Sequence, residues 1–195
     1  MLLAVCVSNG IAADILRVML RISSILFVAA AACLMADSGG GLKWTAPSQW
    51  QPQGQRPMRA ATYAVPAAPG DKVAGECAVY YFGQGQGGGV DANIDRWIGQ
   101  FQQPGGKPSK SVAKIGHTTV HGLKVTTLDV SGAYTGMGGP SMQPGAPAAG
   151  YRLLAAIAEG PKGSIFIKFT GPAKTVEANR AQFEKMVQTL QPGGD

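Results

Sequence analysis

The sequence predicts an α+β fold in which a mainly antiparallel sheet is sandwiched by helices. Strand-like segments follow one another directly, two before the first helical pattern and four between it and the last. Neighbouring strands without a helix between them cannot all be joined by parallel crossovers, so most strand pairs should be antiparallel. Each helical pattern carries one apolar stripe, which a face of the sheet can bury.

Two strands and a helix are expected in the first half of the domain. Residues 58–65 alternate in polarity, and residues 76–83 are rich in aromatic and β-branched side chains. Alternation places Tyr80 and Phe82 on one face of the second strand and Tyr81 on the other. A single helical stripe follows, formed by the apolar residues at 90, 94, 97, 98 and 101.

A hairpin and a long loop open the second half. Residues 114–130 predict a hairpin that turns at His121 and Gly122, because glycine supplies the positive φ of a tight turn. Residues 132–150 are rich in glycine and proline and lack any period, which predicts a loop.

Two more strands and a helix complete the predicted domain. Residues 151–160 and 163–171 are strand-like and flank a short turn. Pro172 is a favoured first helical residue, so the last helix should begin there. Its buried face is expected to consist of Val176, Phe183, Val187 and Leu190.

The N-terminal residues 1–36 predict a targeting signal. Arg17 and Arg21 precede the apolar run ISSILFVAAAACLMA, which ends in small residues as export signals do. These 15 residues are too few to cross a hydrocarbon core of roughly 30 Å. Met19 is an alternative start within this region. We expect residues 37–43 to be a flexible tether and residues 44–195 to form one domain.

Two processing sites fit the end of this signal. The sequence AAAAC, ending at Cys33, resembles a lipobox, in which the cysteine is lipidated and becomes the N-terminus, although Ala30 replaces the usual leucine. Ordinary cleavage after Ala36 fits equally. Both alternatives predict an exported protein of the periplasm or outer cell envelope, with membrane contact only through a lipid anchor at Cys33.

Charge and cysteine content exclude some classes of function. The chain has 17 basic and 11 acidic residues, a net charge of +6, but its lysines are scattered without interleaved aromatic residues. This distribution argues against a nucleic-acid groove. Cys77 is the one cysteine beyond the signal, so no internal disulfide is expected, and its apolar neighbours predict a core position.

Several segments resemble a known family. Trp44, Pro47 and Trp50, then MRAATYAVP, ANIDRWIGQF and FIKFTGPAKTVEANRAQFEKMVQTL, resemble bacterial exported proteins and lipoproteins of unassigned role. Their layout is similar to the PsbP-like superfamily, named for an extrinsic subunit of photosystem II. The most specific pieces are residues 93–97 and 169–172. The resemblance implies a central antiparallel sheet between helices, an accessory or assembly role, and no catalytic residues.

The glycine-rich segment GQGQGGG, residues 83–89, precedes the first predicted helix. A phosphate-binding loop of the Walker type needs Lys and then Ser or Thr after its last glycine, whereas Val90 and Asp91 follow here. Asp91 falls in the first helical turn, where its carboxylate complements the helix dipole. The segment is therefore interpreted as a flexible bend between strand and helix.

A weak metal site is the main chemical alternative. His117 and His121 are four residues apart, and Asp129 on the returning strand is a candidate third ligand. Ser131 and Ser141 lie in or beside loops without a nucleophile elbow. The rival hypothesis is therefore a small hydrolase or metal-dependent enzyme that uses His117 or His121.

The leading hypothesis is a non-enzymatic accessory or binding protein that needs no cofactor. Its partner is expected to be an unidentified envelope protein or ligand. Aromatic side chains are the candidates for lining a ligand surface, although such residues more often form core. They are Trp44, Trp50, Tyr63, Tyr80, Tyr81, Phe82 and Trp97.

Overall fold

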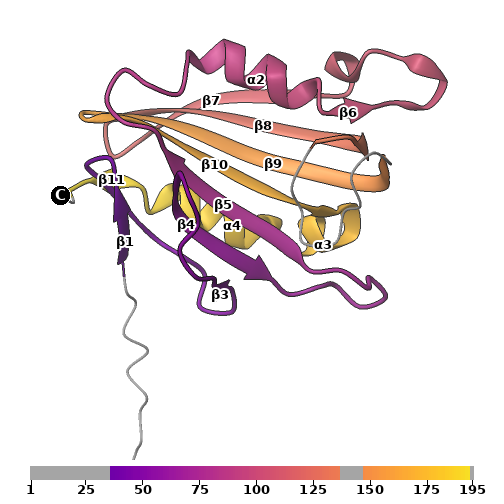
Figure 1. Cartoon of the computed structure of the whole chain (residues 1–195), viewed down its shortest axis with the longest axis horizontal. Helices are drawn as coiled ribbons and strands as arrows, with labels where there is room; N and C mark the ends of the chain where they lie inside the picture. The colour runs from indigo at the N-terminus through magenta and orange to yellow at the C-terminus, as the bar shows by residue number, and fades with distance from the viewer. Residues whose placement is uncertain (1–35, 137–146, 194–195) are drawn as a thin grey trace, which may run out of the picture. The chain divides into compact units, whose positions relative to one another are not determined.

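A central antiparallel sheet organises the domain (Figure 1). The computed structural model describes residues 36–136 and 147–193. In spatial order the sheet is β3, β4, β5, β10, β9 and β8, with β6 and β7 both paired to β8. Every described pair in it is antiparallel, which confirms the predicted fold class. The bounds are β3 Gln51–Pro52, β4 Arg59–Val65, β5 Gly75–Tyr81, β6 Phe101–Gln102, β7 Lys114–Val120, β8 Leu123–Tyr134, β9 Ala148–Gly160 and β10 Gly163–Pro172.

A small second sheet replaces the predicted tether at residues 37–43. It pairs β1 Ala36–Gly39 with β2 Leu42–Thr45, and β2 also pairs with β11 Gln191–Pro192. Gly40 and Gly41 have φ of 62° and 75° and form the turn of the β1–β2 hairpin. The tether prediction was wrong because the same glycines that make a chain flexible also satisfy a tight turn.

Buried side chains hold this hairpin onto the domain. The Trp44 indole is 1 % exposed, and its Nε1 donates a hydrogen bond of 2.8 Å to the Tyr63 hydroxyl of β4. That hydroxyl donates in turn to the Asp37 carboxylate at 2.5 Å. Burial is the largest of the effects that raise the pKa of Tyr63, so the phenol stays protonated and remains a donor.

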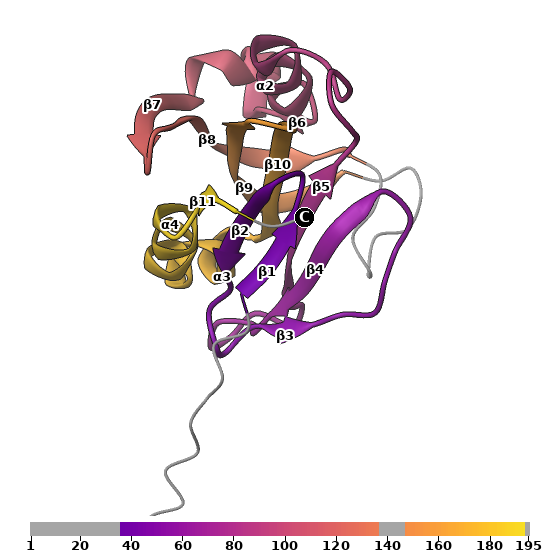
Figure 2. The same ribbon diagram turned by 90° about the vertical axis from the view of Figure 1, so that its left-hand side faces the viewer.

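Helices cover both faces of the large sheet (Figure 2). Helix α2, Val90–Ile98, lies on one face, which we call the α2 side. Helices α3, Ala173–Ala178, and α4, Arg180–Gln188, lie on the opposite face, the α4 side. The segment after β6 contains two short 3₁₀ turns, Pro104–Gly106 and Ser109–Ser111. No helix in the described ranges is long and apolar enough to cross a membrane.

The predicted last helix is divided in two at Asn179. This residue has φ of −107° and ends α3 before α4 begins. Its side-chain amide donates to the Thr175 carbonyl at 3.0 Å, and its Oδ1 accepts from Trp50 Nε1 at 3.4 Å. The side chain therefore competes for backbone groups inside the helical pattern, as asparagine tends to do.

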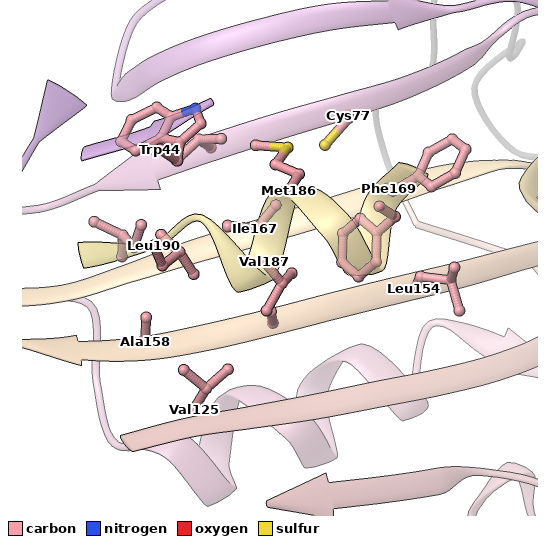
Figure 3. Packing of buried hydrophobic residues seen from close by; sticks show 14 of the residues in the cluster. Trp44, Cys77, Val125, Leu154, Ala158, Ile167, Phe169, Met186, Val187 and Leu190 are labelled. Atoms are coloured by element: carbon pink, nitrogen blue, oxygen red, sulfur yellow. The ribbon is translucent and has the colours of Figure 1, made fainter. Parts of the chain in front are cut away.

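Strand alternation separates two apolar clusters. In β8, Leu123 and Val125 face the α4 side, whereas Leu128 and Val130 face the α2 side. Figure 3 shows the α4-side cluster, where Met186 and Val187 of α4, and Leu190 just after it, pack among residues of the sheet. In β5, Tyr81 packs on the α4 side and Tyr80 on the α2 side, as the sequence predicted.

The predicted β7–β8 hairpin is confirmed. His121 and Gly122 connect the strands with φ of 47° and 82°, so both turn residues adopt positive φ. Two central residues with positive φ are typical of a type I′ turn, whose twist suits an antiparallel hairpin. Histidine thus takes a backbone conformation that the sequence analysis attributed to glycine alone.

Candidate functional site

Polar side chains break the apolar pattern on the α2 side of the sheet. The stripe Ile94, Trp97 and Ile98 of α2 packs against residues of β8, β9 and β10. Strand β4 contributes no residue to that apolar cluster. Charged and aromatic groups occupy the adjoining part of the sheet instead. We call this region the Lys168 face; it consists of Arg59, Glu76, Tyr80, Trp97, Gln100 and Lys168.

The floor of this region is built from small side chains. Lys168 of β10 lies between Ala78 of β5 and Ala155 of β9 in the strand register. Thr62 of β4 extends the same row beyond Ala78. Thr62, Ala78 and Ala155 are all buried, whereas Lys168 and Tyr80 keep part of their surface exposed. The small neighbours leave room for the long lysine chain on the sheet.

Lys168 is held by neutral groups. Its Nζ donates a hydrogen bond of 2.9 Å to Gln100 Oε1 and lies 5.5 Å from the centre of the Trp97 ring. In residues 36–136 and 147–193, no carboxylate oxygen approaches this nitrogen within 4.0 Å. The intervening residues 137–146 contain no Asp or Glu, so they offer no side-chain carboxylate.

The surroundings disfavour the charged form of this lysine. The pKa of Lys168 is lowered from 10.5 to about 8, mainly by burial and also by the cations of Arg96 and Arg59, against an opposing effect of Glu76. Near neutral pH the ammonium is still protonated. It is therefore a positive charge in a partly buried site, and none of the described residues pairs it with a carboxylate.

Arg59 and Glu76 neutralise each other next to it. Arg59 Nη1 lies 2.9 Å from Glu76 Oε1, and both side chains are mostly buried, with 14 % and 13 % of their surface exposed. The Arg59 guanidinium also stacks over the Tyr80 ring, 5.3 Å from its centre. Glu76 receives a second ion pair from Arg56 at 3.0 Å. Glu76 is thus engaged by two arginines.

Aromatic pairs border the face. Tyr80 and Phe82 stack with ring centres 5.9 Å apart, and Tyr134 stacks on Tyr151 at 6.2 Å. The pKa of Tyr134 is raised to about 12, mainly by burial, with smaller contributions from Tyr80 and Glu76. The pKa of Tyr80 is also raised, mainly by burial. Both phenols therefore stay neutral at physiological pH and act as donors or acceptors.

The glycine segment before α2 is a bend, as predicted. Helix α2 starts at Val90, and Asp91 lies in its first turn. The buried Asn93 side chain donates to the carbonyl oxygens of Gly87 and Gly89, at 2.8 and 2.9 Å. Its oxygen accepts a hydrogen bond from Arg96. The segment is therefore fastened by the helix that follows it.

The structure does not bring together the three candidate metal ligands. His117 pairs with Thr126, and Asp129 pairs with Lys114, three positions away along β7. An odd spacing puts His117 and Asp129 on opposite faces of the sheet. His121 Nδ1 lies 2.8 Å from the Leu190 carbonyl oxygen, and His117 Nδ1 lies 3.2 Å from Thr126 Oγ1. Across the described ranges, no group of three His, Cys, Asp or Glu side chains is arranged to hold a metal.

Asp129 belongs to an ion-pair network instead. Arg152 binds it with two hydrogen bonds of 2.7 Å, and Arg180 of α4 adds a third of 2.7 Å. Glu177 bridges the same two arginines, at 2.5 and 3.2 Å. Burial opposes ionisation of Asp129, but the two arginines outweigh it and lower its pKa. The network ties α3 and α4 to β8 and β9.

The remaining predicted candidates have structural surroundings. Cys77 is fully buried, and burial raises the pKa of its thiol, which keeps it protonated. The Ser131 carbonyl accepts a hydrogen bond from Gln103, while Ser141 and Cys33 lie outside the described residues. Asp95 pairs with the exposed Lys110 at 3.0 Å.

A hollow of about 420 Å³ lies between residues 45–49 and α4. It is lined by Gln182, Lys185 and Met186, and Gln182 Oε1 is buried there without a hydrogen-bond partner in the described structure. This orphan acceptor is a single neutral group. The Lys168 face combines a charge, hydrogen-bond donors and aromatic rings, and is therefore the stronger candidate.

Sequence reasoning missed Lys168 as a site residue. The signal was present in IFIKF, residues 165–169, where one lysine interrupts a run of otherwise buried side chains. Alternation places it on the same side of β10 as the buried Phe166. Its partners Trp97 and Gln100 come from a distant part of the chain, 68 residues away in the case of Gln100.

Comparison with known proteins provides likenesses of fold only. No family model matches the chain, and no curated protein matches it. A Pseudomonas aeruginosa protein of unknown function superposes with a TM-score of 0.46 and 14% identity, covering 83% of this chain and 98% of its own. A cyanobacterial PsbP from Synechocystis superposes with a TM-score of 0.47 and 9% identity, covering 86% and 98%. The second belongs to the superfamily whose layout the sequence resembles.

Proposed function

We propose that this chain is an exported, non-enzymatic binding protein of the bacterial envelope that holds its ligand on the Lys168 face. The observation that carries the proposal is Lys168 itself, a partly buried ammonium whose hydrogen-bond partner is the neutral Gln100. An uncompensated charge at such a position reduces stability. Groups of this kind are retained where function requires them.

The same observations weigh against the rival hydrolase. Catalysis by histidine requires a substrate-facing nitrogen positioned by a second group, close to a nucleophile. His117 is exposed beside a threonine hydroxyl, and the His121 ring is engaged by a backbone carbonyl. Their predicted partner Asp129 is occupied by two arginines. A binding role needs no such arrangement and uses the charged and aromatic groups of the Lys168 face.

Export and anchoring complete the proposal. The signal segment, residues 1–36, supports export, and we favour lipidation at Cys33 over cleavage after Ala36. Strand β1 begins at Ala36, which pairs with Thr45, so cleavage after Ala36 would remove a paired strand residue. Two residues separate Cys33 from that strand. Lipidation would therefore hold the domain close to the membrane surface.

Ligand retention after export tests the binding role. The processed chain would be incubated with a small-molecule extract of the envelope, desalted, and examined by native mass spectrometry. We expect adducts on the wild type that are lost in Lys168→Gln. Lys124→Gln, which changes an exposed lysine of β8, is the matched control and should keep them. Equal retention by both variants would place the binding site elsewhere, and the absence of any adduct on the wild type would contradict the proposed role.

A further inference from the structure

Positive charge exceeds negative charge around Lys168. Lys168 and Arg96 both act on this region as cations, and neither is paired with a carboxylate in the described part of the chain. Arg59 is already matched by Glu76. The charged groups that act on Lys168 are Arg59 of β4, Glu76 of β5 and Arg96 of α2, and the titratable Tyr80 of β5 lies under the Arg59 guanidinium.

Hydrogen-bond capacity points in the same direction. An ammonium group has three donors, and Gln100 Oε1 is the one acceptor that the described residues provide to Lys168 Nζ. Two N–H donors are thus left for another acceptor. Arg96 donates to the Asn93 side chain and has further N–H groups on its fork. An oxyanion group matches these donors in both charge and hydrogen bonding.

The aromatic side chains set the second requirement. Trp97 lies against Lys168, and the stacked pair of Tyr80 and Phe82 lies on the same side of the sheet. Tyr80 and Phe82 keep part of their ring surface exposed. Flat apolar groups stack favourably on such rings. A small inorganic anion would leave this surface unused.

We propose that the Lys168 face binds an organic oxyanion, a carboxylate or phosphate group attached to a flat apolar body. This inference rests on the proposed binding function and names the chemistry of its ligand. The anionic group would accept hydrogen bonds from Lys168 Nζ and lie near Arg96. The apolar body would pack on the rings beside Trp97 and Tyr80.

Binding and the protonation of Lys168 are then coupled. A bound anion stabilises the ammonium form, so it should raise the pKa of Lys168 above about 8. Conversely, the affinity for the anion should fall as pH rises beyond that value, because the neutral amine carries no charge. A neutral ligand of the same shape should show neither effect.

Titration with simple probes tests this inference. The processed chain would carry lysines labelled with carbon-13 in their unmodified side chains, and the Lys168 Cε resonance would be identified by its absence in Lys168→Gln. The probes are benzoate, phenyl phosphate, inorganic phosphate and the neutral benzamide. We expect benzoate or phenyl phosphate to bind about tenfold or more tightly than benzamide, and to raise the pKa of Lys168. Lys168→Gln should lose that preference, and Lys124→Gln should retain it.

The outcomes separate this inference from the proposed function. If benzamide binds as tightly as benzoate, the face is a binding surface, but the inference that it prefers anions is wrong. If inorganic phosphate binds as tightly as phenyl phosphate, the apolar part of the inference is wrong. If no probe shifts the Lys168 resonance while the wild type still retains envelope adducts, the inference fails and the binding role stands on another surface. If adducts are absent as well, both proposals fail.

Discussion

At the scale of the residue, Lys168 is the least expected side chain of the domain. The neighbouring Ile167 and Phe169 are fully buried on the α4 side, and Phe166 is buried on the α2 side. A methionine would fill the Lys168 position without a charge. The presence of lysine indicates that this position is not optimised for stability.

Replacing this lysine should stabilise the domain near neutral pH. The pKa of Lys168 is lower in the folded chain than in the unfolded chain. Burying the ammonium therefore reduces the free energy of unfolding below about pH 8, and this reduction disappears as pH rises toward 10.5. Lys168→Met removes the penalty, and we expect a gain of about 1 kcal/mol near neutral pH, reduced by partial exposure. Urea unfolding at several pH values measures it.

The informative quantity is the difference in the free energy of unfolding between Lys168→Met and the wild type. It should shrink across the window from about pH 8 to 10.5, since the unfolded lysine binds the proton more tightly there. Lys124→Met, at an exposed position of β8, should show no such change. A Lys168→Met domain that is less stable at every pH would mean that the ammonium is matched by a favourable partner.

At the scale of the element, alternation made much of the sheet predictable. The opposite placement of Tyr80 and Tyr81 follows from strand geometry alone, and the hairpin at His121 follows from the turn preference of Gly122. The hairpin at residues 36–45 was not predictable, because its glycines fit both a tether and a turn. The burial of Leu42 and Trp44 against distant strands decides between these conformations.

The candidate site was less predictable than the sheet for the same physical reason. A local pattern shows that Lys168 shares a face with Phe166, but it does not show what lies opposite. Trp97 and Gln100 reach the lysine only when α2 and its following turn pack on β10. Segments far apart in the sequence therefore define the charge environment of Lys168. The hydrophobic periodicity of one segment carries no information about it.

The turn at Gly40 tests the hairpin directly. Its φ of 62° disfavours a side chain, and a Cβ there would lie 2.6 Å from the Tyr81 ring. Gly40→Ala should therefore reduce the free energy of unfolding by about 1 kcal/mol or more. Gly54→Ala, where no atom lies within 4 Å, is the control and should change stability little. Equal, near-zero effects of both substitutions in urea unfolding would restore the tether interpretation.

The Asp129 network fastens the C-terminal helices to the sheet. Asp129→Asn would leave Arg152 and Arg180 without their shared carboxylate, so we expect a loss of about 1–3 kcal/mol. Since the pKa of Asp129 is lowered on folding, this stabilisation is present above the ordinary value of 3.8 and is lost as pH falls through the folded pKa. The deficit of the variant should therefore vanish in acid.

An exposed carboxylate provides the matched comparison for that variant. Asp95 pairs with Lys110, and the two side chains are 60% and 70% exposed. Asp95→Asn should change the free energy of unfolding by roughly 0.5 kcal/mol at most. Similar losses in the two variants, or a deficit in Asp129→Asn that persists in strong acid, would show that the network does not act through its charge.

At the scale of the whole molecule, the described domain packs an apolar layer on each face of one sheet. Its first described element, β1, begins at Ala36, the last residue of the segment predicted as a signal. The cluster on the α2 side and the cluster on the α4 side together contain most of the domain's buried apolar side chains. The Lys168 face is where the apolar layer on the α2 side gives way to charge.

Processing of the chain is tested by its intact mass. If Cys33 is lipidated, the membrane-extracted chain should begin at that cysteine and carry acyl groups, and Cys33→Ser should release the chain from the membrane fraction. The folded domain should be unchanged in that variant, which circular dichroism can check. A measured mass that matches an unmodified chain starting at Asp37 would show ordinary cleavage. The lipid anchor would then be removed from the proposed function.

The pKa of Lys168 in the ligand-free, processed chain tests the central claim most directly. Nuclear magnetic resonance titration of its carbon-13-labelled Cε measures this value at a single, unmodified residue. Our account predicts a pKa of about 8, because the ammonium is partly buried among cations and neutral groups. A value at or above the ordinary 10.5 would mean that a counter-ion or water already matches the charge, and would contradict the Lys168 face as a site for an anionic ligand.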